Sequence, residues 1–172
     1  MRRLVVLCSL LVLAVPFAAS ASPHAIGDGT LAVNDLAEVR PGISVSIRVT
    51  QQAGLIGRCD QCSFRLDDIR PNDSTLAAPL VTGAETAKDI DGDGEEEFFS
   101  GRDIRWKIVS GGYVLKIRQG RDIDLSVVGK ARVRLRGING SYSINGGAEK
   151  AVPLDSAIFW LGTPPPPPPT TP

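Results

Sequence analysis

Residues 43–50 read Ile-Ser-Val-Ser-Ile-Arg-Val-Thr, a strict alternation of apolar and polar side chains that decides the fold class. Successive side chains of a β-strand point to opposite faces, so this pattern predicts a strand with one buried face. The alternation recurs at residues 104–108, 113–118 and 130–136, and turn signals separate such stretches at intervals of roughly eight to twelve residues. We therefore predict an all-β chain, folded as an antiparallel β-sandwich or a small barrel.

One turn signal predicts how two of these strands pair. Ser110-Gly111-Gly112 separates residues 104–108 from residues 113–117, a pattern typical of a β-hairpin. The chain has two tryptophans, Trp106 and Trp160, and both lie in apolar or alternating stretches. We expect both indoles to fill the core rather than to line a binding groove.

The N-terminus has the pattern of an export signal. Arg2 and Arg3 precede a short apolar run, and Ala19-Ser20-Ala21 follows it as a cleavage site. The run has too few residues to cross a bilayer, which needs roughly 20. We predict a signal peptide at residues 1–21, cleaved after Ala21, and an exported protein that is secreted or held in the cell envelope.

The C-terminal segment cannot join a core. Residues 164–169 are consecutive prolines, which lack amide donors and favour the extended polyproline II conformation. We predict a disordered proline-rich tail at residues 163–172 and a flexible segment at residues 22–28. A single all-β domain is then expected between them, at residues 29–162.

Charge is divided unevenly along the chain. Lys and Arg balance Asp and Glu at 19 each overall, yet residues 22–97 hold 6 basic and 14 acidic side chains. Residues 98–172 reverse this, with 11 basic and 5 acidic side chains. The division predicts two separate charged surfaces, one suited to cations and one suited to anions.

Two cysteines follow the predicted signal, Cys59 and Cys62, as Cys-Asp-Gln-Cys. In an oxidising compartment this pair is expected to form a disulfide across a tight turn between strands. A labile redox pair is a second reading, and it would need a helix N-terminus to lower the thiol pKa. A metal site is a third, but the only histidine, His24, lies close to the predicted cleavage point.

The most acidic stretch reads Asp89-Ile-Asp-Gly-Asp-Gly-Glu-Glu-Glu97. Alternate aspartates followed by glycine wrap oxygen ligands around a hard cation, so the stretch resembles the calcium loops of EF-hand and dockerin proteins. The predicted ligands are Asp89, Asp91, Asp93, the main-chain carbonyl of Glu95, and Glu97. Two positions depart from that pattern, Ser100 at the twelfth place and Glu96 at the eighth. A solvated acidic turn that blocks edge pairing is the competing interpretation.

Basic side chains recur at alternate positions of two predicted strands, and Arg105 and Lys107 repeat the pattern on a third. Alternate residues share a face, so neighbouring strands of this kind would form a basic plate. An anionic cell-envelope polymer is the predicted partner, whereas nucleic acid is disfavoured because no aromatic residues interleave with the cations. The sequence alone favours the competing interpretation, an ordinary solvated face on which Lys and Arg stems cover apolar surface. The predicted polyanion-binding residues are Lys116, Arg118, Lys130, Arg132, Arg134 and Arg136.

Seven short stretches of glycines and alternating apolar residues carry a family resemblance. They are residues 29–33, 54–58, 81–85, 100–106, 111–113, 123–129 and 142–147. Together they resemble an uncharacterised family of exported all-β proteins from high-GC Gram-positive bacteria, over about residues 29–162. The resemblance implies an all-β domain and no known activity, and it places the cysteine pair and the acidic loop in variable turns.

Catalytic patterns are weak in this sequence. Serine-type hydrolysis needs a histidine partner, and His24 falls in the predicted N-terminal segment. Paired carboxylates could cleave an envelope polymer, with Asp67-Asp68 and the acidic loop as candidates. We therefore expect a non-catalytic structural or binding module of the cell envelope, stabilised by calcium, with a weak envelope-polymer hydrolase as the alternative.

Overall fold

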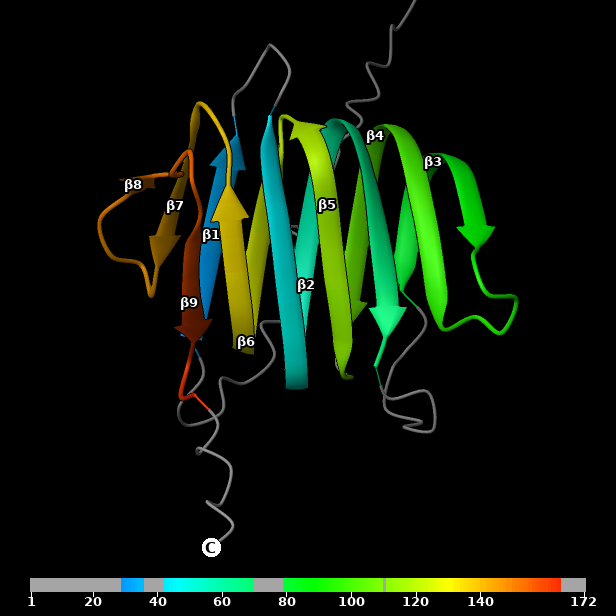
Figure 1. Ribbon diagram of the computed structural model, residues 1–172, viewed down its shortest axis with the longest axis horizontal. Helices are drawn as coiled ribbons and strands as arrows, with labels where there is room; N and C mark the ends of the chain where they lie inside the picture. The colour runs from blue at the N-terminus through cyan, green and yellow to red at the C-terminus, as the bar shows by residue number, and fades with distance from the viewer. Residues whose placement is uncertain (1–28, 36–41, 70–78, 110, 165–172) are drawn as a thin grey trace, which may run out of the picture.

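The computed structural model describes residues 29–35, 42–69, 79–109 and 111–164, and these residues form an all-β fold without a helix. Nine strands follow one another along the chain (Figure 1). They are β1 (Gly29–Asp35), β2 (Ile43–Asp68), β3 (Leu80–Asp89), β4 (Glu96–Val109), β5 (Tyr113–Arg121), β6 (Asp124–Arg136), β7 (Gly140–Ile144), β8 (Lys150–Ala151) and β9 (Ala157–Leu161). The all-β prediction is confirmed, and every pairing between these strands is antiparallel.

The long strand β2 closes the sheet into a small barrel. Residues 43–49 of β2 pair with β5, and residues 61–68 of β2 pair with β5 as well. Ile117 of β5 is opposite both Val45 and Phe64, so the two parts of β2 occupy the two edges of β5. Residues 44–58 of β2 also pair with β6, which completes the wall. A sheet that returns to its own first strand has no free edge around that circuit.

The remaining strands extend this barrel on two sides. β4 pairs with residues 54–67 of β2 and carries β3 on its other edge. β6 pairs with β1 through its first half and with β9 through its second half. β1 then carries β7, and β7 carries the short β8. Across the front of Figure 1, β9, β6, β2 and β5 therefore lie side by side.

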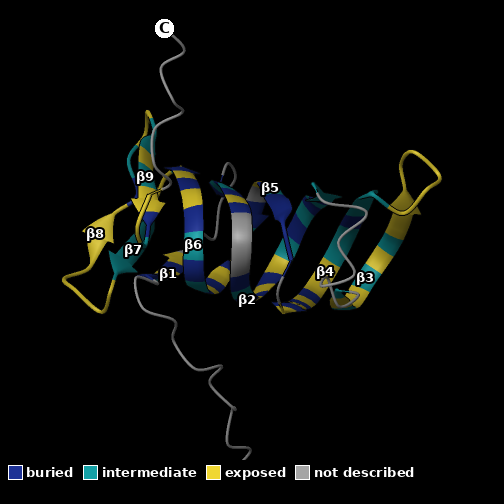
Figure 2. Ribbon diagram, turned by 90° about the horizontal axis from the view of Figure 1, so that it is seen from below, coloured by how far each residue is buried: buried dark blue, intermediate teal, exposed yellow. Residues whose placement is uncertain are grey.

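The alternating apolar residues form one continuous core inside the barrel. Ile47 of β2 and Val133 of β6 are opposite each other and fully buried. Phe64 packs between two aromatic rings, with centroids 5.0 Å from Phe99 and 5.0 Å from Trp106. Figure 2 shows the outcome as bands of buried and exposed residues that alternate along the strands. Because strands such as β6 and the second half of β4 bury every second residue, the polar residues between them form the outer surface.

Gly57 makes room for the largest buried side chain. Trp106 is the cross-strand partner of Gly57, and its indole lies over the glycine backbone. A Cβ atom on Gly57 would come within 2.5 Å of the Trp106 ring. A glycine in a central strand is therefore the condition for burying this indole.

Two expectations about the fold were wrong. β4 and β5 do not form a hairpin, because β5 is paired on both edges with β2 and β4 pairs with β2 and β3. The glycine turn permits a short connection between β4 and β5. The two strands do not pair, because β2 occupies both edges of β5 when the barrel closes. Trp160 does not fill the core but is 38% exposed on β9.

The predicted signal peptide (residues 1–21), the segment 22–28 and residues 165–172 of the predicted tail lie outside the described residues. All nine described strands fall between Gly29 and Leu161. Within the described part of the chain, no helix has the length and hydropathy needed to cross a membrane.

Candidate functional site

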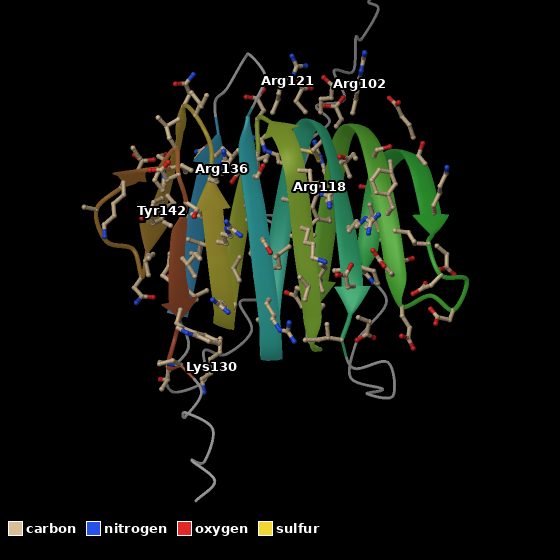
Figure 3. The ribbon with its side chains drawn as sticks, viewed as in Figure 1. Arg102, Arg118, Arg121, Lys130, Arg136 and Tyr142 are labelled. Atoms are coloured by element: carbon tan, nitrogen blue, oxygen red, sulfur yellow. A yellow bond between two sulfur atoms is a disulfide. The ribbon has the colours of Figure 1, made fainter. Side chains whose placement is uncertain are left out.

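The basic residues of β5 and β6 share one outer face of the barrel. Both strands flank residues 43–49 of β2, so their outward side chains form adjacent rows. One row passes from Arg134 through Ser46 to Lys116, and a second joins Arg132 to Arg48. Figure 3 shows Arg118 on β5, and Arg136 and Lys130 toward the two ends of the outward row of β6. We call this surface, defined by Arg48, Lys116, Arg118, Lys130, Arg132, Arg134 and Arg136, the basic face.

Within the described part of the chain, most cations of the basic face have no carboxylate partner. Lys116 donates to Asp67 at 2.5 Å, and Arg136 donates through Nε to the carbonyl of Leu154 at 3.2 Å. The other members make no ion pair or hydrogen bond with any described residue; they are Arg48, Arg118, Lys130, Arg132 and Arg134. The four arginines among them are exposed, and Lys130 is half-buried.

Sequence reasoning missed two parts of this surface. The sequence pattern assigns Arg48 to a half-buried strand but does not assign it to the basic face. The pairing of β2 with β6 shows that it lies opposite Arg132. Trp160 and Ile158 of β9 lie opposite Arg132 and Arg134 and extend the face to the sheet edge. The signal for Arg48 was present as a polar position in the alternation, but the register was needed to assign it.

The third strand of the predicted plate belongs elsewhere. Arg105 and Lys107 are exposed on β4, opposite Arg58 and Ile56 of β2. β4 pairs with neither β5 nor β6, so these cations belong to a different wall of the barrel. We call this wall, defined by Ile56, Arg58, Leu80, Arg105, Lys107 and Asp124, the groove wall.

The groove wall carries a shallow groove of about 600 Å³ with exposed apolar side chains from Ile56 and Leu80. Arg58 donates to Asp124 at 3.3 Å, so part of its charge is neutralised locally. A second hollow of about 330 Å³ shares Arg58 and Asp124 with the groove. It adds three aspartates, Asp60, Asp103 and Asp122.

These carboxylates bear on the hydrolase alternative. Asp60 is 3.5 Å from Arg121, and Asp124 is paired with Arg58, so two of the four hold cationic partners. These two carboxylates are therefore engaged in ion pairs with arginines. The predicted pair Asp67-Asp68 does not converge, because successive residues of a strand point to opposite faces. Hydrolysis by paired carboxylates therefore stays a prediction.

The acidic loop connects β3 to β4, so it lies between strands as expected. Three carboxylates converge there: ligand atoms of Asp89, Asp91 and Asp93 all lie within 4.8 Å of one another. Each also accepts main-chain N–H groups. Asp89 accepts from Gly92 at 2.9 Å and from Gly94 at 3.0 Å, through different oxygens. These contacts hold the loop in a tight turn, and the positive φ angles of Gly92 and Gly94 permit it.

The two predicted glutamate ligands are placed differently. The main-chain carbonyl of Glu95 accepts the N–H of Asp68 at 2.7 Å, which anchors the loop to β2. Glu97 is already in β4, where its register partner is Asp89. Partial burial, and then the charge of Asp89, raise the pKa of Glu97. The pKa of Glu95 is raised too, first by burial and then by Asp93, Asp91 and Asp68. The loop thus concentrates negative charge that a bound cation would relieve.

Cys59 and Cys62 lie at disulfide distance, with Cα atoms 6.1 Å apart and both side chains buried. Both fall within β2: Cys59 follows the part that pairs with β6, and Cys62 lies within residues 61–68, which pair with β5. The expected clip between two strands is instead a link within one strand. Burial keeps the pair from solvent, which suits a structural role.

No family model, no curated protein and no solved structure matches the chain. Its resemblance to exported all-β proteins of high-GC Gram-positive bacteria therefore stays a prediction.

Proposed function

We propose that this protein is a non-catalytic binding module that holds an anionic polymer on its basic face. The observation that carries the proposal is the pairing of β2 with both β5 and β6, which joins cations from three sequence segments in one surface. Four arginines of that surface, Arg48, Arg118, Arg132 and Arg134, are exposed and have no carboxylate partner among the described residues. A polymer with repeated negative charges can satisfy several of them at once.

The spacing of the face suits many weak contacts. Cross-strand neighbours such as Arg132 and Arg48 have Cβ atoms roughly 5 Å apart, and alternate residues of a strand are separated by about 7 Å. Exposed charges interact weakly one at a time and are screened by salt. Affinity then comes from the number of contacts, and it should decline steeply as ionic strength rises.

The proposed place of action is the cell envelope or the medium outside it. The predicted signal at residues 1–21 supports export, and a cysteine pair at disulfide distance is typical of oxidising compartments. An anionic envelope polymer is the partner that fits both the location and the charge of the basic face.

The test compares two variants of equal charge. Residues 22–172 are passed over an immobilised anionic polymer, heparin, and eluted with a salt gradient. We expect the variant R48S/R132S/R134S to elute at much lower salt than the wild type. The control R58S/R105S/K107S removes the same number of cations from the groove wall and should elute near the wild type. Equal losses for the two variants would mean that net charge, rather than the basic face, governs retention, and the proposal would be abandoned.

A second proposed property is stabilisation by calcium. It is supported by the convergence of Asp89, Asp91 and Asp93 and by the raised pKa of Glu97 beside Asp89. Oxygen ligands of this kind suit Ca²⁺, and sites in extracellular modules bind it at about 10⁻⁴–10⁻³ M. The three aspartates would hold the ion, with Glu97, the register partner of Asp89, as a further carboxylate ligand. The role would be structural, since a cation on this loop would link β3 to β4.

Thermal unfolding tests the calcium site. The melting temperature of residues 22–172 is measured in excess EDTA, in millimolar Ca²⁺ and in millimolar Mg²⁺. A ligand at about 100-fold its dissociation constant adds about 2.7 kcal/mol to stability, so a clear rise specific to Ca²⁺ is expected. D91N should lose the rise, whereas D155N, an exposed aspartate outside the loop, should keep it. A rise that persists in D91N would remove the assignment.

A further inference from the structure

The edge of the basic face carries an exposed aromatic ring beside the arginines. Trp160 on β9 is opposite Arg132 on β6, and both side chains are exposed. Arg132 is in turn opposite Arg48, so the indole and two guanidinium groups form one row across three strands. Directly opposed residues of antiparallel strands point to the same side of the sheet.

The position of this indole is fixed by the inward side of β9. Phe159 stacks on Tyr142 of β7, with ring centroids 5.6 Å apart and planes 12° apart. Leu161 is fully buried in the barrel core. Because Trp160 lies between these two anchored residues, its outward orientation follows from the packing of its neighbours. The ring is 38% exposed, whereas Trp106 is 2% exposed.

A ring beside cations restricts the chemistry of the polymer. Arginine alone binds phosphate or carboxylate without regard to the rest of the chain. An indole adds affinity only where the ligand offers an apolar ring face, as a sugar does through its C–H groups. Nucleic acids also combine rings with charge, but proteins that bind them use several aromatic platforms along a cationic groove. Trp160 is the only exposed large aromatic side chain among the described residues, and the next outward position of β9 is Ile158.

We propose that the anionic polymer is an acidic polysaccharide, whose sugar rings pack on Trp160 while its acidic groups meet Arg132 and Arg48. This inference rests on the proposed function, since it names the class of polymer that the basic face would hold. At the β9 edge the protein would bind both the sugar rings and the acidic groups of the polymer. Toward β5 it would bind the acidic groups alone. A ring-free polymer would use only the cationic part.

The experiment measures dissociation constants for three probes by calorimetry at one fixed ionic strength. The probes are polygalacturonate, long-chain inorganic polyphosphate and a single-stranded thymidine oligonucleotide. W160A should bind polygalacturonate about five- to tenfold more weakly than the wild type and should bind polyphosphate within about twofold of it. W160F should recover most of the polygalacturonate affinity. I158A is the matched control, because it removes an exposed apolar side chain beside Arg134 without removing a ring.

The outcomes separate the two proposals. If the wild type binds none of the probes, both proposals fall. If it binds polyphosphate and polygalacturonate and W160A changes neither or both equally, the basic face stands and the polysaccharide inference falls. If W160A loses as much affinity for the oligonucleotide as for polygalacturonate, the indole of Trp160 stacks on any ring of a ligand. The polysaccharide inference then falls as well. An unchanged melting temperature of W160A shows that a loss of affinity reflects binding.

Discussion

Two outer surfaces of the barrel are built from the same strand, β2, yet they differ in how their charges are satisfied. Residues 43–49 contribute Arg48 to the basic face, where most cations have no carboxylate partner among the described residues. Residues 54–58 contribute Ile56 and Arg58 to the groove wall, where Arg58 is paired with Asp124 and apolar side chains are exposed. Buried residues alternate with more exposed ones in both segments, so the difference lies in the strands that pair with them.

The comparison teaches that alternation selects which residues face outward, and register decides what those residues meet. β6 runs along both parts of β2, and it offers Arg132 and Arg134 to one part and Asp124 and Ser126 to the other. A shift of register by two residues would keep the core and change every cross-strand charge pair. The ability to bind an anion is therefore a property of the pairing rather than of any single strand.

The largest expected effect is a loss of stability when a tryptophan is truncated in the core beneath both surfaces. Trp106→Ala deletes a fully buried indole that packs on Phe64 and covers Gly57, so stability should decline by about 3–5 kcal/mol. Trp160→Ala removes the same side chain type from the surface and should cost less than about 1 kcal/mol. Chemical denaturation of both variants measures the contrast. Similar losses would show that Trp160 supports the fold, and its role as a ligand platform would be withdrawn.

An intermediate effect, on the affinity for an anionic polymer, is expected when one cation on each surface loses its carboxylate partner. Asp67→Asn removes the carboxylate that holds Lys116, and Asp124→Asn removes the one that holds Arg58. Both variants gain one unit of positive charge. Only Asp67→Asn should strengthen binding to an anionic polymer, by roughly two- to fivefold, because only Lys116 belongs to the basic face. Affinity measurements at low salt test this, and equal gains would favour a purely global charge effect.

Sequence alone predicted the class of fold and most of the basic face. The period of two in residues 43–50 and 130–136 fixes which side chains point outward, and burial follows it closely. Closure of the barrel could not be predicted, because it depends on β5 pairing with two parts of β2 that are far apart in sequence. The expected hairpin was wrong for that reason, since local turn chemistry favoured it and a non-local pairing replaced it.

The candidate site shows the same division between local and non-local information. The acidic loop is formed by residues that are close in sequence. The spacing of Asp89, Asp91 and Asp93 was therefore enough to predict that their carboxylates converge. The exposure of Trp160 is non-local, because β9 pairs with β6 along one edge and buries Phe159 rather than Trp160. An apolar run of five residues cannot reveal which of its faces the neighbouring strand will cover.

The smallest expected effect is a pH-dependent change in stability at the acidic loop, whose charge is opposite in sign to that of the basic face. Partial burial and Asp89 raise the pKa of Glu97 in the folded protein above its usual value of 4.5. The folded state therefore binds its proton more tightly than the unfolded state, and stability falls as pH rises through the range just above 4.5. At neutral pH the ionised Glu97 destabilises the fold, and Glu97→Gln should raise the melting temperature slightly in EDTA. The gain should shrink as the pH falls below 4.5, because the wild-type carboxyl then becomes protonated in both states.

The control for this prediction is Glu85→Gln, an exposed change on β3 that alters net charge equally. It should show no such pH-dependent gain, because Glu85 is not the register partner of an aspartate. Millimolar Ca²⁺ sharpens the comparison further. If Glu97 is a calcium ligand, Glu97→Gln becomes less stable than the wild type once Ca²⁺ is present, although it is more stable in EDTA. A gain that is the same at pH 4 and pH 7 would mean that neither the burial of the Glu97 charge nor its repulsion from Asp89 is the cause.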